Sequence, residues 1–169
     1  DTNVLVMLDI SGSMAEASGI TVNGQSLTRL QAAVKSIETL LDKYDQVGGV
    51  AVRLVTFSNT AQTLGGDKWL DVAAAKAALA NLTAIGGTNY DFALTTGQTA
   101  FATATGKIAG GQNVSYFFSD GNPTLSSANP TSGNANNGST TEPALGDGID
   151  ATEEAAWKGF LVNNNINSY

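Results

Sequence analysis

Three residues that carry oxygen ligands stand close together near the start of the chain, directly after an apolar run. Residues 4–14 read VLVMLDISGSM, so Asp9 ends the run and Ser11 and Ser13 follow it. Because Gly12 lets the backbone between the two serines turn tightly, both hydroxyls can point to one side. A carboxylate and two hydroxyls are hard oxygen ligands, which bind Mg²⁺ or Ca²⁺ in proteins. This stretch is therefore the first candidate for a cation site.

Two later segments offer matching oxygen atoms. Asp120 stands at the end of another apolar run, residues 113–121, and directly before a glycine, and the glycine-hinged loop at 86–89 carries Thr88. If the two runs are neighbouring parallel strands, Asp9 and Asp120 face each other at the sheet edge where α/β proteins bind ligands. Two close carboxylates repel each other, and a divalent cation neutralises them. Three hydroxyls and two carboxylates suit a six-coordinate ion.

The elements that must position these residues alternate along the chain. Runs rich in apolar and β-branched residues predict buried strands at 3–11, 50–58 and 113–121. Periodic apolar positions predict helices at 26–46, 71–82, 90–104 and 149–165. Such alternation implies right-handed crossovers, and so an α/β, Rossmann-like doubly wound, mostly parallel central sheet with helices on both faces. We expect a single domain over 1–169, with a short antiparallel edge strand around AQTLGG and a long polar loop at 122–148.

The motifs resemble those of von Willebrand factor type A (vWA) domains, also called integrin inserted-domain-like modules. DISGS resembles the Asp-x-Ser-x-Ser signature of that family, GGTNY resembles its threonine loop, and FFSDGNP resembles its distal aspartate loop. The resemblance extends over residues 3–121 and more loosely through the last predicted helix. It implies a metal-ion-dependent adhesion site (MIDAS) with one divalent cation, Ca²⁺ or Mg²⁺.

The resemblance also implies a role for each candidate residue. Ser11 and Ser13 coordinate the ion directly, and Thr88 does so directly or through water, depending on the conformational state. Asp9 and Asp120 hold the ion through water or by hydrogen bonds to its ligands. A Glu or Asp of a partner completes the coordination shell.

The chain departs from the family pattern in two places. Members of the family continue after the last helix with another core strand and a terminal helix, whereas this sequence ends at Tyr169. We therefore interpret the sequence as C-terminally truncated and expect NINSY to begin that strand. The loop at 122–148 is unusually long and polar, and it follows the distal aspartate directly.

Composition narrows the classes of function. Eight basic residues against 15 acidic ones give a formal net charge of −7, which argues against nucleic acid as a partner. The absence of cysteine and histidine excludes disulfides, thiolate or imidazole metal sites and triads that use a histidine. No apolar run approaches the roughly 18 residues of a membrane span, so we expect no membrane insertion.

Simpler interpretations of the same residues stay open at this stage. Taken alone, Asp9 also fits a turn acid, with Ser11 and Ser13 capping a helix, and the combination with Thr88 and Asp120 is what favours the metal site. Asn89 and Asp91 are best explained as a helix cap and a first-turn acid. A second calcium site at Asp147 and Asp150 lacks the spacing of an EF-hand, so we do not favour it, and we expect Asp150 or Thr152 to cap the last helix.

We expect a binding module that grips an acidic group on a protein or glycan partner through its metal ion. Composition resembles that of the giant repeats-in-toxin surface adhesins, which implies an extracellular or bacterial cell-surface location, a role in adhesion or biofilm formation, and neighbouring domains of a larger adhesin as further partners. Two alternatives remain: a docking domain of an intracellular metal-chelatase or ATPase assembly, and a structural adhesin domain whose ion only stabilises the fold. We do not expect an enzyme, because no general base such as histidine is available.

Overall fold

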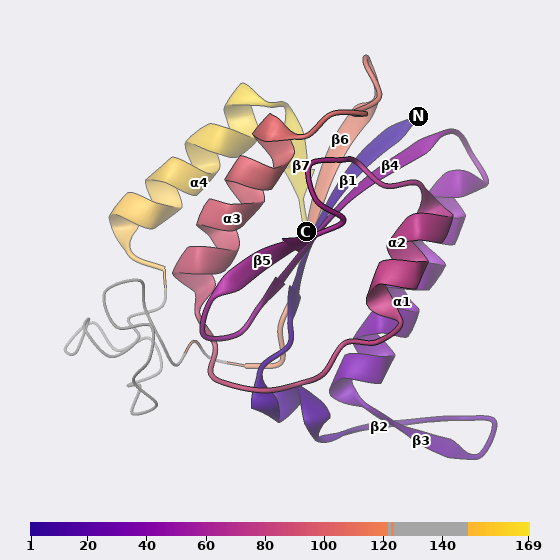
Figure 1. The fold of residues 1–169 in the computed structure, drawn as a ribbon. Coiled ribbons are helices and arrows are strands. Elements are labelled where there is room, and N and C mark those ends of the chain that lie inside the picture. The colour runs from indigo at the N-terminus through magenta and orange to yellow at the C-terminus, as the bar shows by residue number, and fades with distance from the viewer. Residues whose placement is uncertain (122, 124–148) are drawn as a thin grey trace.

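A five-stranded sheet organises the computed structural model, which describes residues 1–121, 123 and 149–169. Its strand order is β5-β4-β1-β6-β7 (Figure 1). The central strand β1 (Thr2–Asp9) pairs in parallel with β4 (Val50–Phe57) and β6 (Gln112–Phe118). At the edges, β7 (Ile166–Ser168) pairs in parallel with β6, and β5 (Ala61–Leu64) pairs antiparallel with β4. The first and third apolar strands, β1 and β6, are therefore neighbours, which is the condition under which Asp9 and Asp120 reach the same edge of the sheet.

Helices cover both faces of this sheet (Figure 1). The helices α1 (Arg29–Asp45) and α2 (Val72–Leu79) pack with the β1 side chains of Val4, Val6 and Leu8. On the opposite face, α3 (Tyr90–Thr103) and α4 (Ala151–Asn163) pack with Leu5 and Met7. Because successive side chains of a strand point to opposite faces, β1 is buried along its whole length. The predicted doubly wound, mostly parallel α/β fold is confirmed.

One prediction fails at the start of the first helix. The helix expected over 26–46 begins at Arg29, because β3 (Gln25–Thr28) pairs antiparallel with β2 (Ala17–Val22). Asn23 and Gly24 have φ values of 50° and 78°, the left-handed pair that a two-residue hairpin turn requires. Thr28 then caps the helix in a reciprocal capping box with Gln31. The Asn-Gly pair was the available signal for this hairpin.

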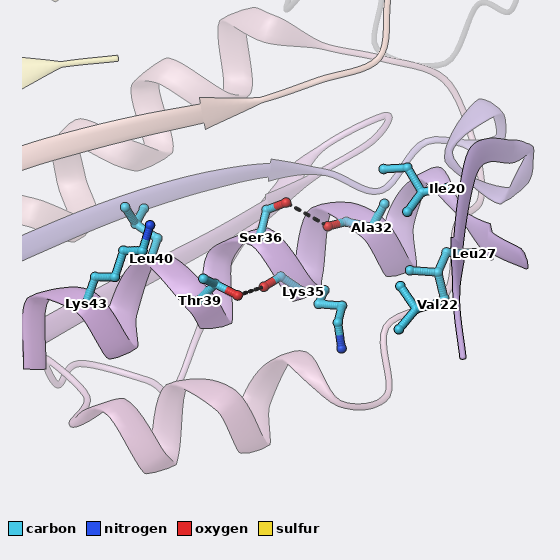
Figure 2. Close-up of a pocket in the computed structure, with 9 residues that line it drawn as sticks. All are labelled: Ile20, Val22, Leu27, Ala32, Lys35, Ser36, Thr39, Leu40 and Lys43. Carbon is cyan, nitrogen blue, oxygen red and sulfur yellow. Dashed lines mark hydrogen bonds between the residues drawn. The ribbon is translucent and has the colours of Figure 1, made fainter. Parts of the chain in front are cut away.

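The hairpin and α1 enclose a surface groove of about 420 Å³ (Figure 2). Most of the residues that line it are apolar, among them Ile20, Val22, Leu27 and Leu40. Lys35 and Lys43 also line it. Among the residues that the structure describes, no carboxylate lines the groove, so it does not compete with the sheet edge as a cation site.

The remaining elements follow the predictions closely. NINSY supplies β7, the AQTL stretch supplies β5, and Asp71 and Asp150 cap α2 and α4 as expected. Apart from Pro123, the polar loop at 122–148, with Asp147, lies outside the described residues. Within the described part of the chain, no helix is both long and apolar enough to cross a bilayer.

Candidate metal-ion site

Asp9 ends β1 in a fully buried position, with no exposed surface. Its Oδ1 accepts the Ser11 backbone N–H at 2.7 Å, and its Oδ2 accepts the Ser119 hydroxyl at 2.7 Å. Burial raises the pKa of Asp9 above its ordinary value, hydrogen bonds from Ser11 and Ser119 oppose that rise, and the charge of Asp120 adds to it. A buried carboxylate with a second carboxylate nearby is an environment that a cation stabilises.

The two serines link Asp9 to Asp120. The Ser11 and Ser13 hydroxyl oxygens lie 3.2 Å apart, and the Ser13 hydroxyl donates to Asp120 Oδ1 at 3.0 Å. Ser11 precedes the short 3₁₀ helix η1 (Gly12–Ala15), but its side chain makes no capping bond there. The simpler interpretation was half right: Asp9 does accept a turn N–H, while the Ser11 hydroxyl faces the other oxygens instead of capping a helix.

The loop that carries Thr88 lies against the serine loop. The Gly12 backbone N–H donates to the Gly86 carbonyl at 2.8 Å. A Cβ on Gly12 would lie 3.5 Å from that oxygen, so the two backbones approach closely. Thr88 itself is buried, with 4% of its surface exposed. Just after it, Asn89 caps α3 by accepting the Phe92 backbone N–H at 3.1 Å, which confirms the predicted capping role.

These contacts bring the predicted ligands to one edge of the sheet. Asp9, Ser11, Ser13 and Asp120 form a continuous chain of hydrogen-bonded groups, with the Thr88 loop beside it. Among the described residues, no group of three or more Asp, Glu, His or Cys side chains is arranged to hold a metal. The predicted donor set is two carboxylates plus neutral hydroxyls, which fits a hard divalent cation such as Mg²⁺ or Ca²⁺ and not an ion that prefers thiolate or imidazole ligands, such as Zn²⁺ or Cu²⁺.

The structure adds three residues that the sequence analysis did not single out. Ser119 donates to Asp9, and the Tyr90 hydroxyl donates to Ser119 Oγ at 3.0 Å and also to the Gly121 carbonyl. Arg29 Nη1 lies 2.9 Å from Asp120 Oδ2. Ser119 and Tyr90 stand inside the FFSDGNP and GGTNY motifs, so their position was a usable signal, whereas nothing in the sequence linked Arg29 to Asp120.

Burial and the surrounding charges also affect Tyr90. Burial raises the pKa of its phenol, the hydrogen bond with Ser119 opposes that rise, and the nearby Asp9 and Asp120 add to it. Tyr90 therefore stays a neutral donor that fixes the orientation of Ser119, and through it of Asp9.

Comparison with known protein families agrees with this geometry. The family model described as the von Willebrand factor type A domain matches residues 4–122, which include all five candidate ligands. The chain belongs to this family. No curated protein sequence matches the domain.

Solved structures show the same fold in this vWA domain. A von Willebrand factor type A structure from Catenulispora acidiphila is 18% identical with a TM-score of 0.61, and the match covers 99% of this chain and 32% of that one. The vWF domain of the type V pili tip protein Mfa5 from Porphyromonas gingivalis is 23% identical, with a TM-score of 0.57 over 74% of this chain and 39% of that one.

A third match is the pilus adhesin SpaC from Lactobacillus rhamnosus GG, which is 22% identical with a TM-score of 0.54. The match covers 73% of this chain and 16% of SpaC. The vWA domain thus spans less than two fifths of each of these three structures.

Proposed function

We propose that this vWA domain is a divalent-metal-dependent binding module that uses a MIDAS to engage an acidic group on a protein or glycan partner. The observation that carries the proposal is the chain of hydrogen bonds from Asp9 to the Ser11 backbone N–H, from the Ser11 hydroxyl to that of Ser13, and from Ser13 to Asp120. It lies at the carboxyl edge of neighbouring parallel strands, the place where α/β sheets bind ligands.

The chemistry of the donor set explains why such a site would take an anionic partner. In this proposal Ser11 and Ser13 are direct ligands of a Ca²⁺ or Mg²⁺ ion, Thr88 binds it directly or through water, and Asp9 and Asp120 act through water or by orienting the other ligands. Hydroxyls are neutral, so the bound ion retains positive charge that a carboxylate from outside can neutralise.

We place the proposed function at the bacterial cell surface, in adhesion or biofilm formation, with neighbouring domains of a larger adhesin beside this one. Two structural relatives, a pili tip protein and a pilus adhesin, support that setting. The narrower proposal of a repeats-in-toxin adhesin rests on composition alone, because these relatives are pilus proteins. We further propose that the domain is not an enzyme, since both carboxylates of the site serve the ion and the chain has no histidine.

Titration of the metal-stripped domain with Ca²⁺ and then Mg²⁺, followed by calorimetry, tests the site. We expect saturable binding of one ion per chain. Ser11→Ala should weaken binding by at least about tenfold, because it removes a direct ligand. Ser36→Ala is the matched control, since the Ser36 hydroxyl only donates to the Ala32 carbonyl on the outside of α1. Equal binding by Ser11→Ala and the parent would contradict the proposed site.

A second measurement tests the proposed partner chemistry. Beads coated with the domain should adhere to a poly-L-glutamate surface in Ca²⁺ or Mg²⁺ and release in a chelator. A chain of net charge −7 is otherwise repelled by that surface. Ser11→Ala beads should need at least about ten times more ion to adhere, because the variant lacks one direct ligand. Adhesion of the mutant beads equal to that of the parent would mean that ions bridge the two surfaces without the site.

A further inference from the structure

Arg29 places a positive charge directly on the candidate metal site. Its Nη1 lies 2.9 Å from Asp120 Oδ2, 3.0 Å from Glu16 Oε2 and 3.4 Å from the Ser13 carbonyl oxygen. The Arg29 side chain is 38% exposed, and that of Asp120 is only 11% exposed. The guanidinium therefore pairs with one of the two carboxylates on which the site depends.

Local helix energetics do not explain why Arg29 stands there. Arg29 is the first residue of α1, where the positive end of the helix dipole repels a cation. The capping box of Thr28 and Gln31 already satisfies the helix end. What stabilises the Arg29 guanidinium is instead its contact with Asp120 and Glu16, both outside the helix.

Asp120 divides its two oxygens between different partners. Oδ1 accepts the Ser13 hydroxyl at 3.0 Å, whereas Oδ2 accepts Arg29. A divalent cation that used the negative charge of Asp120 would meet the Arg29 charge on the same carboxylate, and like charges repel. Arg29 would keep a partner if it left Asp120, because its Nη1 already lies 3.0 Å from Glu16 Oε2. The Glu16 side chain is 63% exposed.

We propose that Arg29 is an internal cation that competes with the divalent ion for Asp120 and so lowers the metal affinity of the site. When the ion binds, the guanidinium leaves Asp120 and stays paired with Glu16. This inference rests on the proposed function, because it assumes that the ion binds at Asp120. It means that the site needs a higher concentration of divalent cation to fill than it would without Arg29, and that metal binding leaves the guanidinium paired with Glu16 alone.

Calorimetric titration of Arg29→Gln with Ca²⁺ and Mg²⁺ tests the competition. We expect Arg29→Gln to bind the preferred ion with a Kd about fivefold lower than that of the parent, because the ion no longer competes with a partly exposed ion pair. Lys35→Gln is the matched control, because it removes the same charge from α1 at the groove shown in Figure 2. The control should bind the ion as the parent does. Arg29→Lys, which retains the charge but not the fork of donors, should fall between the parent and Arg29→Gln.

Two further measurements extend the test: the melting temperature with and without metal, and the coupling between Glu16 and Arg29 in metal binding. Without metal, Arg29→Gln should melt at a lower temperature than the parent, because Asp120 loses its partner; with saturating metal the gap should close. Glu16→Gln should weaken metal binding in the parent but change it little in Arg29→Gln, since Glu16 acts through Arg29.

The outcomes separate this inference from the proposed function. Equal or weaker metal binding by Arg29→Gln, while Ser11→Ala weakens binding as predicted, would overturn the competition and leave the MIDAS in place. Metal binding by Arg29→Gln but not by the parent would support both. If neither the parent nor Arg29→Gln binds Ca²⁺ or Mg²⁺, both proposals are wrong.

Discussion

At the scale of single residues, the candidate site depends on a carboxylate that the fold keeps away from water. Asp9 is fully buried at the end of β1, yet both of its oxygens accept hydrogen bonds, from Ser11 and from Ser119. Those bonds compensate part of the cost of burying the charge, and a bound cation would compensate more. Ser119 and Tyr90 therefore matter to the site although neither is a predicted ligand, because they fix the second oxygen of Asp9.

Another carboxyl with a shifted pKa lies at the start of α4. Glu153 accepts the Asp150 backbone N–H at 2.8 Å. Burial raises its pKa from 4.5 to about 7, and the nearby charge of Asp91 contributes to the rise. Between these two pH values the folded chain holds a proton that the unfolded chain has released. The stability contributed by Glu153 is therefore full below pH 4.5 and is lost as the pH rises through about 7.

Glu153→Gln tests this linkage, because glutamine keeps the side-chain length and the oxygen for Asp150. We expect the variant to exceed the parent in free energy of unfolding by about 1 kcal/mol at about pH 8, a value reduced for solvent screening. The gain should disappear near pH 4.5, the lower end of the window. Urea denaturation at both pH values measures it. Glu154→Gln, an exposed acid paired with Lys158 in the same helix, should show no such gain. An equal gain for Glu153→Gln at both pH values would contradict the linkage.

At the scale of elements, α3 packs closely against β1, the strand that ends in Asp9. Gly97 lies on the face of α3 that meets the strand, and a Cβ there would lie 2.8 Å from the Met7 sulfur. Met7 has no exposed surface, so it has little room to yield. The helix can approach β1 this closely only because position 97 has no side chain, which explains a glycine inside an otherwise regular helix.

Gly97→Ala should consequently destabilise the domain although alanine favours helix. Overpacking costs about 1–3 kcal/mol and the gain in helix propensity returns about 1 kcal/mol, so we expect a net loss of about 1 kcal/mol in the free energy of unfolding. Gly159→Ala in α4 is the matched control, because a Cβ there meets nothing within 4 Å. The control should gain up to about 1 kcal/mol. Denaturant unfolding of both variants decides the matter, and a gain in both would show that Met7 moves aside freely.

At the scale of the whole molecule, the buried sheet stabilises the fold, whereas the net charge of the chain destabilises it. The hydrophobic clusters on the two faces of the sheet meet along β1, so the strand that ends in Asp9 is the best buried in the domain. The chain carries a formal net charge of −7, and repulsion among its acidic groups favours the unfolded state. Any divalent ion therefore has a general screening effect in addition to binding at the site.

Raising the NaCl concentration from about 0.01 M to about 1 M should raise the melting temperature of the metal-free domain. The Debye length falls from about 30 Å to about 3 Å over that range, so repulsion between acidic groups is screened. Lys35→Gln, which makes the net charge more negative by one, should respond more steeply. Ca²⁺ at matched ionic strength should add a further rise in the parent but not in Ser11→Ala. A melting temperature that falls with NaCl would show that attractive ion pairs outweigh the repulsion.

The sequence by itself determined the fold class and the central strands, and it predicted that the candidate ligands converge if the first and third apolar strands are neighbours. Buried parallel strands can be recognised in a sequence as unbroken apolar runs, and Asp9 and Asp120 each end such a run. The carboxyl ends of neighbouring parallel strands meet at one edge, so their proximity followed from topology. The caps at Asp71, Asn89 and Asp150 were equally predictable, because a cap is a local hydrogen bond.

Only the tertiary structure decided the contacts between residues far apart in the chain. Arg29 and Asp120 are 91 positions apart, and Ser119 and Asp9 are 110 apart. Whether such pairs meet depends on how α1 and β6 pack against β1, and no local pattern carries that information. The same holds for Gly97, whose role comes from the Met7 side chain on another element. The hairpin before α1 was missed for a different reason, since its Asn-Gly turn was legible but stood next to a strong helical pattern.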